Sequence, residues 1–233
     1  MMNFTSEIRK TIEKMKSNEL IIAKELYQEK FSMIPEITYY KILERLVEQK
    51  ALIKASKGVY YVPDLTRFGL TGPGYEEIIR FFTRDKTGMT VGYDLYNRLK
   101  LTTQIGKDFQ VLSNSLKAKT KNISGVSIEF IDLAFDEKTK KNIEMLEVLE
   151  HYPEIEDFDR WAFKKFLSSF SKEFDEKNLE EVIYKKRYKK RTIAFLSAIL
   201  NEKGIKNTLK RFLSGTSKYK IPNREELHEL TSA

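Results

Sequence analysis

The sequence predicts an α+β protein in which a small β-containing region is followed by a mainly helical one. Short β-rich runs alternate with helical periodicity up to about residue 135, whereas apolar residues keep helical spacing from residue 136 to about residue 215. The chain has 233 residues, of which 41% are hydrophobic and 12% aromatic, so it can bury a sizeable core. We expect one domain over residues 1–68 and a second over residues 69–233, with its sheet part ending near residue 135.

The first 63 residues predict a helix, a strand, two further helices and a hairpin, in that order. Apolar spacing predicts helices over residues 7–15, 23–31 and 35–49, and the run 20–22 predicts a short strand. Pro35 separates the second helix from the third, and Gly58 can take a positive φ in the turn of the hairpin at 52–63. This order is typical of a winged helix-turn-helix, in which the second of the paired helices can enter the major groove of DNA.

Polar and basic side chains on the third helix and the hairpin are the candidate DNA contacts. Helix residues on one face can reach base edges and phosphates, and hairpin lysines can touch the flanking backbone. The candidates are Thr38, Tyr40, Lys41, Arg45, Lys54 and Lys57. The same fold can instead serve only protein contacts, because residues 1–66 carry 11 basic and nine acidic groups.

Beyond a boundary at residues 69–74, the pattern predicts a small sheet region and then five helices. Helices are expected at 75–83 and 93–99 and strands at 109–113 and 126–131, with Lys117, Lys119 and Lys121 on an exposed sheet edge. The last of the five later helices covers residues 205–213 and ends at Gly215. We expect the last ten residues to fray.

Positive charge concentrates in a short block between two of these helices. The block consists of Lys185, Lys186, Arg187, Lys189, Lys190 and Arg191 around one tyrosine. Cations at the start of a helix oppose its dipole, which favours a functional role toward DNA phosphates or a partner protein. The alternative is that the block pairs with residues 136–184, where 14 acidic residues outnumber eight basic ones.

Several kinds of site are not expected. The chain has no cysteine and only two histidines, His151 and His228, and it has no glycine-rich phosphate loop or nucleophile elbow. We therefore expect no catalytic residues, no metal and no cofactor. The longest apolar run, residues 193–200, is too short to cross a bilayer, and the N-terminus lacks an apolar signal core, so we expect a cytoplasmic protein without a membrane partner.

Three stretches occur in the order found in one known family. Residues 20–26 (LIIAKEL), 43–47 (LERLV) and 57–63 (KGVYYVP) form the first, residues 99–106 (LKLTTQIG) the second, and residues 188–215 the third. Over residues 18–215 the chain resembles the AbiEi-type antitoxins of type IV abortive-infection systems. Lys100 stands where that family usually has glycine, and Gly106 where it usually has proline.

The resemblance implies a function. Such antitoxins bind inverted repeats of double-stranded DNA in their own promoter through the winged helix and repress transcription, and their C-terminal domain counters a separately encoded nucleotidyltransferase-type toxin in anti-phage defence. On this hypothesis the chain binds DNA as a homodimer. Two alternatives remain: a nuclease or nucleotidyltransferase, which needs clustered carboxylates for a divalent metal, and a solitary winged-helix regulator without a toxin.

Overall fold

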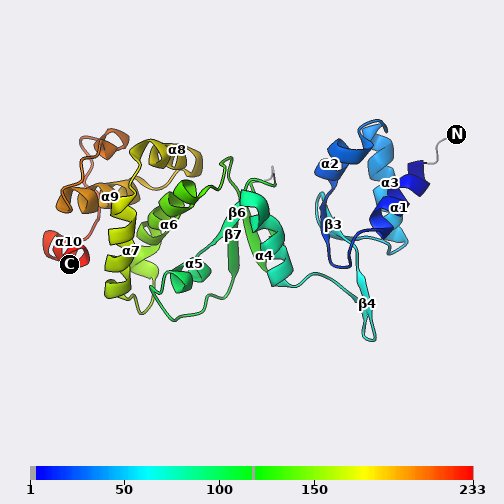
Figure 1. Ribbon diagram of the computed structural model, residues 1–233, viewed down its shortest axis with the longest axis horizontal. Helices are drawn as coiled ribbons and strands as arrows, with labels where there is room; N and C mark the ends of the chain where they lie inside the picture. Colours follow the sequence, from blue (N-terminus) through cyan, green and yellow to red (C-terminus); the bar gives the residue numbers. More distant parts are fainter. Residues whose placement is uncertain (1–3, 117–118, 233) are drawn as a thin grey trace.

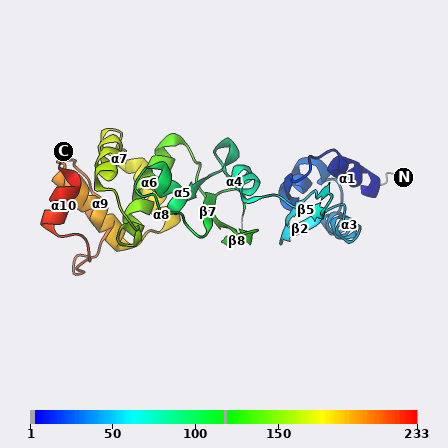
Figure 2. The same cartoon turned by 90° about the horizontal axis from the view of Figure 1, so that it is seen from below.

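The computed structural model describes residues 4–116 and 119–232 and has the mixed α+β composition that the sequence predicts. The molecule is elongated, with the N-terminus at one end and the last helix at the other (Figures 1 and 2). None of the helices in the part of the chain that it describes is long and apolar enough to cross a membrane.

The N-terminal unit contains three helices and a three-stranded sheet, in the predicted order. Its elements are α1 (Phe4–Glu13), β1 (Leu20–Ile22), α2 (Ala23–Leu26), the π-helical turn η1 (Tyr27–Phe31), α3 (Glu36–Glu48), β2 (Ile53–Ser56) and β3 (Val59–Tyr61). Strand β3 lies in the middle of the sheet and pairs antiparallel with both β1 and β2. Gly58 occupies the turn between β2 and β3 with a φ of 77°, which side chains rarely adopt.

Helix α3 is fixed by its apolar face. Tyr39 and Leu43 are fully buried and pack in a cluster that includes Ile8 and Ile12 of α1. The hydroxyl of Tyr39 donates a hydrogen bond of 3.0 Å to the carbonyl oxygen of Ala23, which ties α3 to the start of α2. The opposite face of α3 is therefore the one that remains in solvent.

A second hairpin, which the sequence pattern did not reveal, follows the N-terminal unit. It consists of β4 (Asp64–Thr66) and β5 (Gly69–Thr71) and projects from the side of the molecule (Figure 1). The predicted boundary after residue 68 falls at its turn. Phe68 at that turn is 84% exposed, and the guanidinium of Arg67 lies over its ring.

The second unit begins with a helix packed on a four-stranded sheet. Its elements are α4 (Tyr75–Thr83), η2 (Arg84–Lys86), β6 (Gly88–Val91), α5 (Tyr93–Arg98), β7 (Phe109–Ser113), β8 (Thr120–Ile123) and β9 (Val126–Phe130). The strand order is β6-β7-β9-β8, with β7 and β9 parallel and the other pairs antiparallel. Strand β8 is the expected edge, with Lys119 exposed beside it and Lys121 half-buried on it, while Lys117 lies outside the described residues.

A shared apolar cluster joins the two units. Leu20 and Val59 of the N-terminal sheet belong to the same buried cluster as Phe82 of α4 and Val126 of β9. Strand β2 also runs close to β8. The two units are therefore held together by buried apolar contact as well as by the connecting chain.

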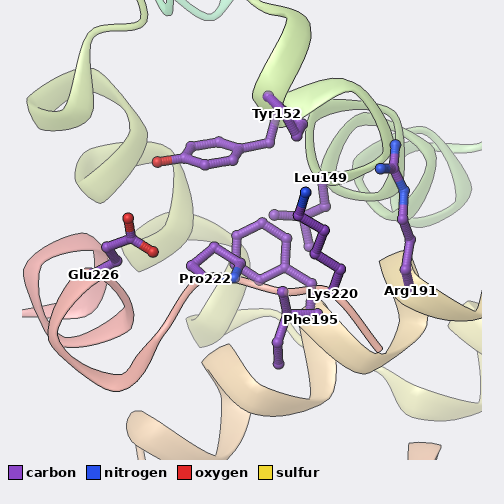
Figure 3. Close-up of a pocket in the computed structure, with 9 residues that line it drawn as sticks. Leu149, Tyr152, Arg191, Phe195, Lys220, Pro222 and Glu226 are labelled. Atoms are coloured by element: carbon purple, nitrogen blue, oxygen red, sulfur yellow. The ribbon is translucent and has the colours of Figure 1, made fainter. Parts of the chain in front are cut away.

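The rest of the chain is helical. It contains α6 (Glu137–His151), η3 (Tyr152–Glu154), α7 (Arg160–Lys172), α8 (Glu176–Lys186), α9 (Lys190–Glu202), η4 (Leu209–Phe212) and α10 (Arg224–Thr231). Two expectations were wrong: residues 205–213 form only the single 3₁₀ turn η4, and the C-terminus forms the capped helix α10 instead of fraying. The segment before α10 lines one side of an open cavity of about 370 Å³, which the end of α6 and helix α9 also line (Figure 3).

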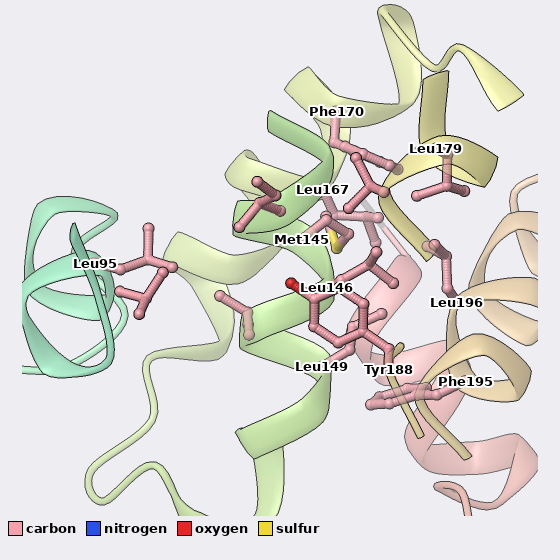
Figure 4. Packing of buried hydrophobic residues seen from close by; sticks show 14 of the residues in the cluster. Leu95, Met145, Leu146, Leu149, Leu167, Phe170, Leu179, Tyr188, Phe195 and Leu196 are labelled. Carbon is pink, nitrogen blue, oxygen red and sulfur yellow. The ribbon is translucent and has the colours of Figure 1, made fainter. Parts of the chain in front are cut away.

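Helix α6 lies at the centre of this helical part. Leu146 and Leu149 point from it toward Leu167 of α7, Leu179 of α8 and Phe195 of α9 (Figure 4). Each of these side chains is buried, so α6 has apolar contacts on several sides. This explains why nine of its 15 residues are buried, including two glutamates.

Candidate nucleic-acid interface and the basic block

Three of the four predicted residues on α3 lie on one outward face of the helix. Thr38, Lys41 and Arg45 are spaced three and four residues apart, which places them in one stripe. Lys41 and Arg45 are exposed and Thr38 is half-buried. Within the described residues, Lys41 and Arg45 form no ion pair, so both cations are available to an anionic partner.

Tyr40 is separated from this stripe. It lies five residues before Arg45, about 140° around the helix axis, and its ring packs edge-on against Tyr39 at 5.3 Å. Burial, together with Glu36 and Tyr27, raises the pKa of the Tyr40 hydroxyl. The structure therefore does not bring Tyr40 together with the three other candidates of the helix.

Acidic side chains border the stripe. Glu44 and Glu48 are exposed on the other side of Lys41, and together with Glu36 they outnumber Lys41 and Arg45 on α3. Because carboxylates and phosphates repel each other, DNA can approach α3 favourably only from the side that carries Thr38 and Arg45. Further cations outside α3 are needed for strong binding.

Strand β2 and the turn that follows it supply such cations. The side chains of Lys54 and Lys57 are exposed, and the carbonyl oxygen of Lys57 accepts a hydrogen bond from Nζ of Lys121 on β8. Burial and the nearby Lys57 lower the pKa of Lys121. Lys121 was not predicted to lie at this interface, because 64 residues separate it from Lys57 and no local pattern connects them.

The basic block at residues 185–191 is largely paired within the protein. Its pairs join Lys185 to Asp132 at 2.6 Å, Lys186 to Glu129 at 2.7 Å, Lys189 to Glu150 at 2.8 Å and Arg191 to Glu154 at 3.9 Å. Arg187 and Lys190 are exposed and form no ion pair within the described residues. Acidic groups of the same chain therefore account for four of the six cations. Glu150 and Glu154 belong to the acidic stretch 136–184 that the alternative named, whereas Asp132 and Glu129 precede it.

Glu150 explains how helix α9 tolerates cations at its start. Its carboxylate accepts hydrogen bonds from the backbone N–H of Lys189 and from the hydroxyl of Thr192, and it pairs with Nζ of Lys189. A carboxylate from α6 thus takes the position of a cap at the positive end of α9. Burial raises the pKa of Glu150, but the hydrogen bonds from Lys189 and Thr192 outweigh it and hold the pKa below its usual value.

We expect Glu150→Gln to destabilise the protein in a pH-dependent way. A carboxyl group whose pKa is lowered by folding stabilises the protein above its unfolded pKa, near 4.3, and this contribution is lost as the pH falls through the folded value. At pH 7 the variant should lose about 1–3 kcal/mol of unfolding free energy, and the difference from wild type should shrink as the pH falls below about 4.3. Urea unfolding across this range measures the effect. Glu137→Gln, at an exposed position of the same helix, is the control and should show no such trend.

Glu147 is a second buried carboxylate of α6. Its Oε1 atom accepts a hydrogen bond of 2.8 Å from the hydroxyl of the buried Tyr188 and lies 3.9 Å from Nζ of Lys186. Burial raises the pKa of Glu147, and Lys186 and Tyr188 offset part of that rise. The single tyrosine of the basic block therefore serves the helical core.

We expect Tyr188→Phe to lower the free energy of unfolding by about 1–3 kcal/mol, because it removes a hydrogen bond from a buried carboxylate. Tyr184→Phe is a matched control, since Tyr184 lies exposed on α8 and should shift stability by less than about 0.5 kcal/mol. Equal losses in the two variants, measured by urea unfolding, would contradict this role for Tyr188.

Residues 99–106, the second of the three stretches described above, form a loop that two hydrogen bonds fix to the helical part of the chain. The hydroxyl of Thr102 donates to the carbonyl oxygen of Glu156, and the side-chain amide of Gln104 donates to Asp157. Between these anchors and the next strand, Ile105 is 88% exposed. Within residues 4–116 and 119–232 no group of three or more His, Asp or Glu side chains is placed to hold a metal ion.

Part of the chain matches the model of a protein family. Residues 7–147 match a family described as a family of unknown function (DUF6088), and the match spans more than half of the chain. It covers the N-terminal unit, the sheet region and most of α6. No curated protein matches the sequence.

Proposed function

This chain belongs to the DUF6088 family, and we propose that it is a DNA-binding repressor of its own promoter. The observation that carries the proposal is the order α1, β1, α2, α3, β2, β3 with the sheet order β1-β3-β2. We interpret this unit as a winged helix-turn-helix, with α3 as the helix that enters the major groove and the β2–β3 turn as the wing.

The charges suggest how DNA is held. Thr38, Lys41 and Arg45 face base edges, and Lys54 and Lys57 contact the flanking phosphates. Lys121 strengthens the phosphate contact, because two neighbouring cations relieve their mutual repulsion when an anion binds between them. A homodimer would present two such helices to the two halves of an inverted repeat.

The proposal extends to an antitoxin that counters a nucleotidyltransferase-type toxin in the cytoplasm as part of anti-phage defence. This part is supported by the resemblance of residues 99–106 and 188–215 to the AbiEi-type antitoxins. Co-expression with the product of the adjacent gene tests it: the chain should restore growth that this product inhibits. A neighbouring gene whose product is harmless would overturn it and favour a solitary regulator.

Fluorescence anisotropy tests the DNA-binding part. The full chain is titrated into a labelled duplex from upstream of its own gene and into a scrambled duplex of equal length, each at two salt concentrations. We expect at least tenfold tighter binding to the upstream duplex, and weaker binding of both at high salt. Equal affinity for the two duplexes, or no binding at low salt by folded protein, would overturn the proposal.

One observation favours protein contact as a second candidate role for α3. Met33 and Ile37, at the turn before α3 and in its first residues, are 73% and 74% exposed, and acidic residues outnumber basic ones on the helix. Exposed apolar side chains of this size are common in protein interfaces. In the DNA titration this role would appear as no binding to either duplex.

A further inference from the structure

The cavity at the C-terminal end of the molecule has the volume and the mixed polar and apolar lining that are typical of a small-molecule site. It lies between the end of α6, helix α9 and the segment before α10, and its volume is about 370 Å³, within the range of known ligand pockets. Helix α3, the β2–β3 turn and strand β8 contribute nothing to its lining. The cavity is therefore independent of the proposed DNA interface.

One end of the cavity is cationic. Arg191 is held in place by a hydrogen bond of 2.9 Å from its Nη2 atom to the carbonyl oxygen of Glu150, and the same atom lies 3.9 Å from the exposed carboxylate of Glu154. Lys220 reaches over the cavity from the segment before α10 and forms no ion pair within the described residues (Figure 3). A fixed guanidinium beside an unpaired ammonium group is suited to a phosphate or a carboxylate.

The middle of the cavity is apolar. The rings of Tyr152 and Pro222, which are half-buried, line it, and the buried Phe195 lies behind them with its ring edge-on to Tyr152 at 5.5 Å (Figure 3). Such a surface is suited to a planar ring, which stacks without requiring polar partners.

The other end offers hydrogen-bond acceptors. The Tyr152 side chain points toward Glu226 of α10 (Figure 3). One carboxylate oxygen of Glu226 accepts a hydrogen bond of 2.9 Å from the backbone of Asn223, and the other has no hydrogen-bond partner within the described residues. This carboxylate can accept hydrogen bonds from N–H groups of a ligand.

We propose that this cavity binds a purine nucleoside monophosphate. Its phosphate pairs with Arg191 and Lys220, its base lies against Tyr152 and Pro222, and its N–H edge donates to Glu226. An anionic group, a planar ring and a donor edge in this order match the three parts of the cavity. A neutral aromatic compound or a fatty acid matches only two of them.

Isothermal titration of the full chain without DNA tests the proposal with four probes: GMP, AMP, guanosine and inorganic phosphate. We expect GMP or AMP to bind at least about tenfold more tightly than guanosine and than phosphate. Lys220→Gln should weaken that binding about tenfold or more, whereas Lys218→Gln, an exposed lysine two residues away, should leave it unchanged. Glu226→Gln should also weaken it, while glutamine retains the helix cap.

Three results would overturn the proposal: no binding of either nucleotide, guanosine binding as tightly as GMP, or equal nucleotide affinity in the Lys218 and Lys220 variants. A melting curve for each variant separates loss of the site from loss of the fold. Because no DNA is present, failure here leaves the repressor proposal untouched.

Discussion

Replacing Lys41 and Arg45 together by alanine should weaken binding to the upstream duplex by about 2–6 kcal/mol, which corresponds to at least about 30-fold in affinity. Each side chain is exposed, lacks an ion pair within the described residues and lies in the stripe that we propose enters the groove. Contacts to base edges would be lost along with two positive charges, so affinity for the scrambled duplex should fall less than affinity for the upstream duplex. Anisotropy titrations with both duplexes measure this difference.

A matched control removes the same charge elsewhere. Lys10 and Lys14 lie exposed on and just after α1, and their double alanine variant also lowers the net charge by two. It should weaken binding to both duplexes slightly and equally. If the two double variants behave alike, net charge alone explains the binding and α3 is not the helix that reads the sequence.

Phe82→Ala should lower the free energy of unfolding by about 3–5 kcal/mol. The ring is fully buried in the cluster that α4 shares with the N-terminal sheet and the four-stranded sheet, so its removal leaves a cavity where the two units meet. Phe81→Ala is the control, because the neighbouring ring is only partly buried and lies under Arg84. Urea unfolding of both variants measures the effect, and similar losses would contradict a special role for Phe82.

Most of the helices and strands could be predicted because their signals are local. The β-branched run Leu20–Ile22 and the helix Tyr75–Thr83 occur as expected, since periodicity and flanking glycine or proline residues define them. Strand β6 was missed because it begins at Gly88, and glycine is disfavoured in strands. A side chain there would collide with the backbone, since its Cβ atom would lie 2.3 Å from the carbonyl oxygen of Phe82.

The helix predicted at residues 205–213 failed for a different reason. Asn207 donates from its side chain to the carbonyl oxygen of Ile205 and accepts from the backbone N–H of Leu209. Side-chain bonds of this kind offer the backbone an alternative to helix, which periodicity does not register. At the C-terminus a helix forms where fraying was expected, because the capping box of Asn223 and the burial of Leu230 stabilise α10.

The candidate interface could be predicted only in part. Helical spacing correctly placed Thr38, Lys41 and Arg45 on one face, and the same spacing separates Tyr40 from them. The nearness of Lys121 to Lys57, and of Glu129 to Lys186, depends on how distant strands and helices pack. Such contacts across more than 50 residues carry no signal in local sequence.

For the repressor proposed above, the buried cluster between the N-terminal unit and the second unit has a consequence for the spacing of the two half-sites on DNA. Because the N-terminal unit packs against the second unit, it does not rotate freely about the connecting chain. In a dimer, the distance and the relative rotation of the two α3 helices are therefore fixed by the rest of the protein. Five extra base pairs between the half-sites would turn one of them by about half a helical turn to the far side of the duplex. Such a promoter should lose cooperative binding of the dimer. A promoter lengthened by a full helical turn should place both half-sites on the same side of the duplex again and regain that binding.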